Sequence, residues 1–183
     1  MNDITTPTTN TQPGMLVTGL FRDRESAEAA YGSAAARGYS KDDLSLVMSD
    51  ETRTRHFPNE PGVTTELGTK AAEGAGVGGA IGGTVGAIAA AIAAVGTTLV
   101  LPGIGWVVAG PLAAALAGAG AGAAGGGLIG ALIGWNIPEE RVKQYEAGVK
   151  DGGILMGLRA RDEADAAHLQ SEWERGRGEG VYR

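Results

Sequence analysis

The chain contains no cysteine, which excludes disulfide bridges and thiolate metal sites. Its two histidines, His56 and His168, stand apart from any pattern of further metal ligands. Lys and Arg residues are scattered and the net charge is −6, which argues against nucleic-acid binding because that requires a clustered basic face. No serine or threonine lies in a recognisable nucleophile elbow. We therefore expect no enzymatic activity and no metal.

Aromatic residues make up only 5% of the chain, too few for a conventional core along its whole length. Charge is absent altogether from residues 74–138. Glycine is abundant instead, at 32 of 183 residues or about 17% of the chain, whereas about 7% is usual. Residues 74–79 and 120–125 match the G-x-G-x-x-G dinucleotide pattern. Neither match follows a predicted strand, and chance matches are common in a chain this rich in glycine, so we expect no cofactor.

Residues 1–14 are polar and aperiodic, and we expect a disordered tail. This segment lacks the basic and apolar regions of a signal peptide, so we do not expect export by that route. Residues 15–50 predict a β-α-β unit. Its first strand covers residues 15–21, Asp23 caps the following helix, and Leu44–Met48 form the second strand. Residues 51–70 are predicted to be a polar linker.

Residues 138–183 return to ordinary amphipathic sequence. Pro138 suits the start of a helix. Val142, Tyr145 and Val149 give this helix an apolar stripe. A strand at 154–158, a helix capped by Asp162 and a short strand at 181–182 are predicted to follow it. The two flanks resemble each other and would pair as the βαβ halves of a ferredoxin-like α+β fold. The alternative is that strand–Asp–helix is merely a common pattern.

Residues 71–137 are predicted to form a helical hairpin inserted between these halves. Its helices would cover residues 71–95 and 111–135, each about 37 Å long and sufficient for a ~30 Å hydrocarbon layer. Pro102 and the glycines beside it break the helix within residues 96–110.

A four-residue glycine period is the most specific signal in the chain. Residues four apart stack on one helix face, and a row of glycines lets a second helix approach closely. The predicted helix-packing residues are Gly74, Gly78, Gly82, Gly86, Gly118, Gly122, Gly126, Gly130 and Gly134.

A membrane-associated hairpin is one interpretation of this segment. Lys70, Arg141 and Lys143 flank it, so the positive-inside rule places the α/β domain in the cytoplasm. Trp106 near the hairpin tip and Trp135 at its exit would then lie at the two membrane surfaces, or simply pack within protein. The alternative is a cytoplasmic protein whose hairpin is buried in itself or in an oligomer, because Ala and Gly insert only weakly into lipid.

Residues 17–23, 38–47 and 145–155 resemble the small α/β domain of the bacterial general-stress (heat-induced stress, YflT-type) protein family. Residues 101–105 and 110–116 resemble the longer members of that family, which carry a glycine-rich apolar segment. The resemblance implies a stress-linked role and supplies no catalytic residues.

These observations predict a non-enzymatic, stress-associated protein. Its glycine-zipper hairpin would insert into membrane lipid and drive homo-oligomer formation, with the α/β domain as a cytoplasmic interaction module. Two alternatives remain: a soluble self-assembling scaffold with the hairpin buried between subunits, and a small-ligand regulatory module. No nucleic-acid partner is expected, and nothing in the sequence identifies a protein partner.

Overall fold

The computed structural model describes residues 14–56, 99–101, 105–118, 132 and 137–183. Its strands are β1 (Met15–Phe21), β2 (Leu44–Ser49), β3 (Leu99–Leu101), β4 (Trp106–Ala109), β5 (Ile154–Ala160) and β6 (Glu179–Tyr182). Its helices are α1 (Arg24–Ala36), the 3₁₀ turn η1 (Lys41–Asp43), α2 (Asp50–His56), α5 (Pro111–Gly118), α7 (Glu139–Lys150) and α8 (Glu163–Arg175).

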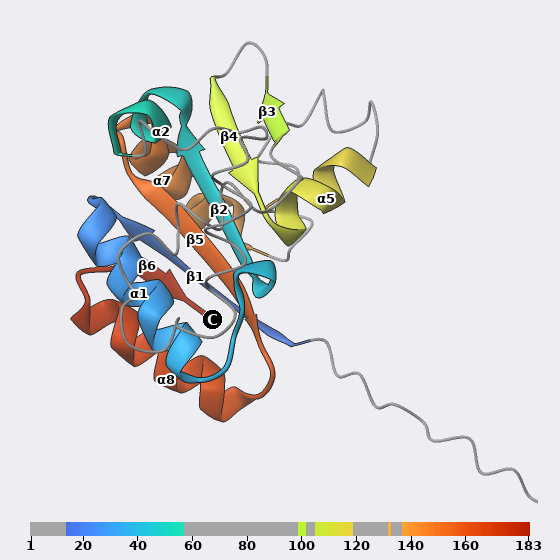
Figure 1. Cartoon of the computed structure of the whole chain (residues 1–183), viewed down its shortest axis with the longest axis vertical. Helices are drawn as coiled ribbons and strands as arrows, with labels where there is room; N and C mark the ends of the chain where they lie inside the picture. The colour runs from blue at the N-terminus through green and yellow to red at the C-terminus, as the bar shows by residue number, and fades with distance from the viewer. Residues whose placement is uncertain (1–13, 57–98, 102–104, 119–131, 133–136) are drawn as a thin grey trace, which may run out of the picture.

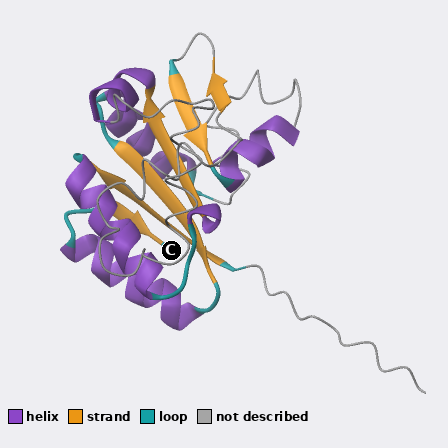
Figure 2. Ribbon diagram, in the orientation of Figure 1, coloured by secondary structure: helices purple, strands orange, loops and turns teal. Residues whose placement is uncertain are grey.

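These elements form an α+β fold around one six-stranded sheet (Figures 1 and 2). The strand order is β3-β4-β2-β5-β1-β6, and every neighbouring pair is antiparallel. The α+β class expected from the sequence is therefore confirmed. The four strands of the two flanks are adjacent, and the insertion adds β3 and β4 beside β2.

The two flanks contain strand–helix units of the same design. Both α1 and α8 have 13 residues, and each begins after an aspartate in extended conformation. The Asp23 carboxylate accepts a hydrogen bond from the Ser26 amide at 2.8 Å, and Asp162 accepts one from the Asp165 amide at 2.7 Å. Both predicted caps are confirmed, because each carboxylate satisfies an N–H that the first helical turn leaves free.

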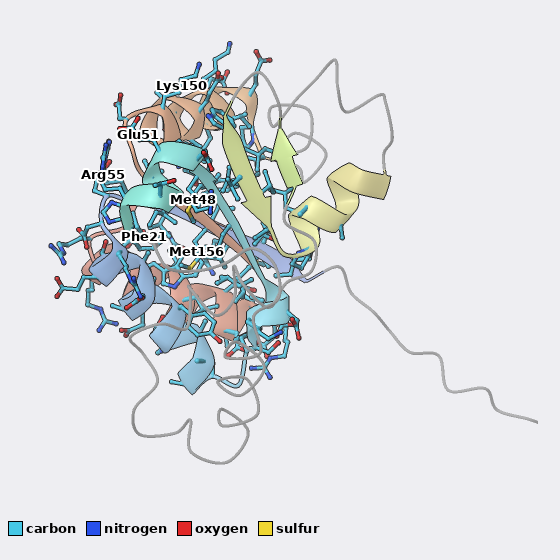
Figure 3. The ribbon with its side chains drawn as sticks, turned by 45° about the horizontal axis from the view of Figure 1, so that its top comes forward. Phe21, Met48, Glu51, Arg55, Lys150 and Met156 are labelled. Carbon is cyan, nitrogen blue, oxygen red and sulfur yellow. The ribbon has the colours of Figure 1, made fainter. Side chains whose placement is uncertain are left out.

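Helices α1 and α8 cover the first face of the sheet. Ala27, Ala30 and Ala34 of α1 are buried against this face, and their small size lets α8 bring Trp173 into the core with no exposed surface. The Trp173 indole meets Phe21 edge to face at 5.7 Å and donates to the Ala30 carbonyl at 3.1 Å. Figure 3 shows Phe21, Met48 and Met156 in this core, with Glu51, Arg55 and Lys150 at the surface.

Helix α7 packs on the second face. Val142, Tyr145 and Val149 form its predicted apolar stripe and are each at most 1% exposed. The Tyr145 hydroxyl lies 2.8 Å from the Thr18 hydroxyl and donates to the Gly180 carbonyl at 2.7 Å. A buried phenol is tolerated here because its polar end has partners on β1 and β6.

Two features between the flanks were not expected from the sequence. Helix α2 covers Asp50–His56, although residues 51–70 were expected to be a polar linker, and the Thr52 amide in its first turn donates to the Ser49 hydroxyl at 3.0 Å. The predicted break in the helix at residues 96–110 is non-helical where it is described, but it contains strands β3 and β4, which were not predicted. The predicted helix at 71–95 lies outside the described residues, whereas a helix does begin at Pro111 as expected. No helix in the described part of the chain combines the length and apolar character that crossing a bilayer requires.

A buried acid links the end of α1 to the start of α8. The Asp165 carboxylate accepts from the Tyr39 hydroxyl at 2.7 Å and from Arg161 at 3.1 Å, and it pairs with Arg37 at 3.0 Å. The hydrogen bond from Tyr39, followed by the two guanidinium groups, holds the pKa of Asp165 below its usual value against the opposing effect of burial.

We expect the cluster to stabilise the fold in a pH-dependent manner. Because the folded-state pKa of Asp165 is lowered, its contribution is present above the unfolded-state value of about 3.9 and is lost as pH falls through the folded-state pKa. Asp165→Asn should lower the free energy of unfolding by about 1–3 kcal/mol at neutral pH. In urea titrations the deficit should shrink at pH ~3. A deficit of equal size at both pH values would contradict this assignment.

Candidate functional site

The insertion joins the sheet through β4 and the start of α5, and we call residues 105–113 the insertion junction. Strand β4 pairs with β2 in a continuous register from Leu46 opposite Ala109 to Ser49 opposite Trp106. Strand β3 then pairs with the outer side of β4. Figure 1 shows β3, β4 and α5 together on one side of the molecule. The middle of the predicted hairpin is therefore part of the α+β domain.

Trp106 lies inside the protein. Its side chain is 3% exposed and belongs to the core of the second face, together with Val47 and Leu155. Val108, two residues later on the same face, has no exposed surface. Placement of Trp106 at a distant membrane surface is therefore wrong, and the packing interpretation is the one observed. Trp135 lies outside the described residues.

The turn from β4 into α5 depends on a close approach that only glycine permits. Gly110 has φ +85°, and a Cβ at this position would lie 2.0 Å from the Leu44 carbonyl oxygen. The Leu112 amide donates to the Ser45 hydroxyl at 3.2 Å, and Ser45 is 3% exposed. Backbone contact and a buried serine together hold the first turn of α5 against the start of β2.

The opposite end of β4 is held by α2. The Asp50 amide donates to the Gly105 carbonyl at 2.7 Å, which joins the first residue of α2 to the turn before β4. Gly105 is exposed, has φ +66° and would place a Cβ in open space. The insertion junction is therefore attached to the flanking domain at both ends of β4.

Helix α5 and the end of the second apolar stretch share one core. Leu112 and Ala113 of α5 are each 1% exposed, and Leu132 and Ile137 are 1% and 3% exposed. All four belong to the core of the second face, which also contains the apolar stripe of α7. Part of the uncharged run is thus accounted for by packing on the sheet.

A small hollow of about 140 Å³ opens beside the junction. Its polar lining is mostly engaged in local structure: Asp43 accepts from the Ser40 amide at 2.7 Å, and Asp42 pairs with Lys41 at 2.6 Å. The volume is below the ~300 Å³ typical of small-molecule pockets. The lining residues are Asp42, Asp43, Ser45, Pro111, Gly157 and Arg159.

Only one of the nine predicted helix-packing glycines lies within the described residues. Gly118 is the last residue of α5, and the other eight zipper glycines lie outside the described residues. From the sequence, Gly105 was expected only to help break a helix, and no contact was predicted for Gly110 or Ser45. The available signal was the β-branched and aromatic run at 106–109 between two glycines.

The contacts of the insertion junction are those of packing and attachment. Within these ranges, no three His, Cys, Asp or Glu side chains are grouped so as to hold a metal ion. No protein-family model, curated protein or solved structure matches the chain.

Two glycines provide a matched test of the junction. Gly110→Ala should lower the free energy of unfolding by about 2–4 kcal/mol, because it combines left-handed strain with a clash against backbone. Gly105→Ala, also at positive φ but facing open space, should cost only about 1–2 kcal/mol. Urea denaturation followed by tryptophan fluorescence measures both. Equal losses would show that the close approach to Leu44 contributes nothing.

Proposed function

We propose that this is a non-enzymatic, stress-associated protein in which an α+β domain holds glycine-rich apolar segments for association with membrane lipid and with further copies of the chain. The observation that carries the proposal is the insertion junction, because β4 and α5 attach the apolar segments to the sheet. A domain that fixes the attachment points of an apolar segment in this way can present that segment to a partner at a defined position.

The membrane and self-association parts rest on the sequence beyond the junction. The uncharged run covers residues 74–138, and the insertion junction is only residues 105–113 of it. Glycines at four-residue spacing favour close helix contacts, which lipid-facing and oligomeric helices both use. The basic residues flanking the run favour a cytoplasmic position for the α+β domain.

A second candidate is a soluble self-assembling scaffold. The burial of Trp106, Val108 and Leu112 in the second core favours it, because these apolar residues of the predicted hairpin are packed against protein. A small-ligand regulatory role has less support, since the hollow beside the junction holds only about 140 Å³.

We further propose that the flanking domain is a ferredoxin-like interaction module. The neighbour order β6-β1-β5-β2 and the position of α1 and α8 on one face support this assignment. The stress association rests on the sequence resemblance of residues 17–23, 38–47 and 145–155 alone. Such resemblance concerns packing and turn residues and does not identify the stress signal.

Fractionation of cells that express the full chain tests lipid association. We expect the protein to sediment with membranes, to resist a high-salt wash because the contact is apolar, and to be released by detergent. Recovery in the high-speed supernatant, as a large particle without detergent, would instead establish the soluble scaffold.

Self-association is tested by filling the glycine groove. Gly122→Leu combined with Gly126→Leu should shift the full chain toward smaller species, because leucine side chains prevent close helix approach. Ala121→Leu with Ala124→Leu adds comparable volume to the same segment away from the glycine row, and this control should retain the native distribution. Analytical ultracentrifugation in detergent measures both. An unchanged distribution for the glycine variant would refute the zipper.

A further inference from the structure

A row of small and polar residues crosses the second face of the sheet, within an otherwise apolar core. Gly157 of β5 lies opposite Thr18 of β1 and opposite Ser45 of β2, and Figure 1 shows these three strands side by side. Thr18 and Ser45 are only 1% and 3% exposed. Between them Gly157 contributes no side chain, whereas the next residues on this face, Leu155 and Val47, belong to the second core. Two buried hydroxyl groups therefore flank a position without a side chain.

Two hollows meet at this row. The outer hollow is the one of about 140 Å³ beside the insertion junction, and its lining includes Ser45 and Gly157. The inner hollow has a volume of about 10 Å³, which is roughly the space that one water molecule or hydroxyl group needs. It is lined by Thr18 and again by Ser45 and Gly157. Because the two hollows share these two residues, they adjoin each other.

The two hydroxyl groups offer complementary hydrogen bonds to the inner hollow. Tyr145 donates its single hydroxyl hydrogen to the Gly180 carbonyl at 2.7 Å, so Thr18 is the donor in its 2.8 Å contact with Tyr145. The Thr18 oxygen therefore keeps its capacity to accept. The Ser45 oxygen accepts from the Leu112 amide at 3.2 Å, and the described part of the chain provides no acceptor for the Ser45 hydroxyl hydrogen. The inner hollow suits a group that accepts one hydrogen bond and donates another.

We propose that the two hollows bind a small, uncharged polyol that places one hydroxyl group in the inner hollow. This hydroxyl accepts from Ser45 and donates to Thr18, and the rest of the ligand lies in the outer hollow. A carboxylate only accepts and an ammonium group only donates, so neither matches both partners. The volume of about 140 Å³ restricts the ligand to a molecule smaller than those that fill pockets of ~300 Å³. The site is independent of the proposed lipid association and self-association.

The charged groups around the outer hollow favour an uncharged ligand. The Asp42 carboxylate pairs with Lys41 at 2.6 Å. The Asp43 carboxylate accepts from the Ser40 amide at 2.7 Å and from its hydroxyl at 2.8 Å. Arg159, the cation of this lining, is engaged in an interaction as well. A charged ligand would have to displace one of these partners, whereas ligand hydroxyls add to them because carboxylate oxygens accept several hydrogen bonds.

Saturation-transfer NMR on the full chain tests the site with glycerol as the probe. The control ligand is 1,2-dimethoxyethane, which has as many non-hydrogen atoms as glycerol but no O–H group. Glycerol should give saturable transfer with a Kd on the order of 1 mM or weaker. The ether should bind at least about tenfold more weakly, because it cannot donate to Thr18. Saturable transfer of equal strength from the ether would overturn recognition of a hydroxyl group.

A matched pair of variants locates the binding. Thr18→Val removes the accepting oxygen, keeps the shape of the side chain and leaves Tyr145 bonded to Gly180. It should raise the Kd for glycerol about 3–10-fold, the loss expected for one hydrogen bond. Thr54→Val removes an exposed hydroxyl of α2 that donates to the Asp50 carbonyl, and this control should leave the Kd unchanged.

Two results would overturn the polyol site. One is an unchanged Kd for glycerol in Thr18→Val. The other is glycerol transfer to the unaltered chain that does not saturate, which would mean that the inner hollow takes water only. The comparison of glycerol with the ether uses the unaltered chain, so it decides the question even where Thr18→Val fails to fold.

Discussion

The pairing of β4 with β2 is the interaction on which the rest of the architecture depends. It satisfies backbone groups along β2 that would otherwise form an open sheet edge. It also places Trp106 and Val108 on the second face, where they extend the core that α7 covers only in part. The close approach of Gly110 to Leu44 then directs the chain into α5. An insertion attached in this way is a component of the domain.

This arrangement gives the uncharged run two roles within one stretch of sequence. Its middle, at 106–113, packs against the sheet, and the glycine-rich stretches on either side are tethered by it. Absence of charge is required equally by a protein core and by a lipid environment, so composition alone does not separate the two.

The flanks were predictable because their signals are local. Asp23 and Asp162 cap helices through amides three residues away, and the stripe of Val142, Tyr145 and Val149 follows from helical periodicity. Helix α2 was missed because it is short and polar. It is stabilised by ion pairs within the helix and by the bond from Asp50 to the carbonyl of Gly105, a residue far along the chain. Nothing near residues 50–56 reveals that contact.

By itself, the sequence determined the α+β class, both helix caps, the buried stripes, and the exceptional length of the uncharged, glycine-rich run. These properties follow from composition and from spacings of three or four residues. Only the tertiary structure decided that residues 106–109 form a strand, that Trp106 is a core residue, and that Gly110 and Ser45 hold α5. Each of these depends on β2, because strand pairing and close backbone approach join residues that no local periodicity relates.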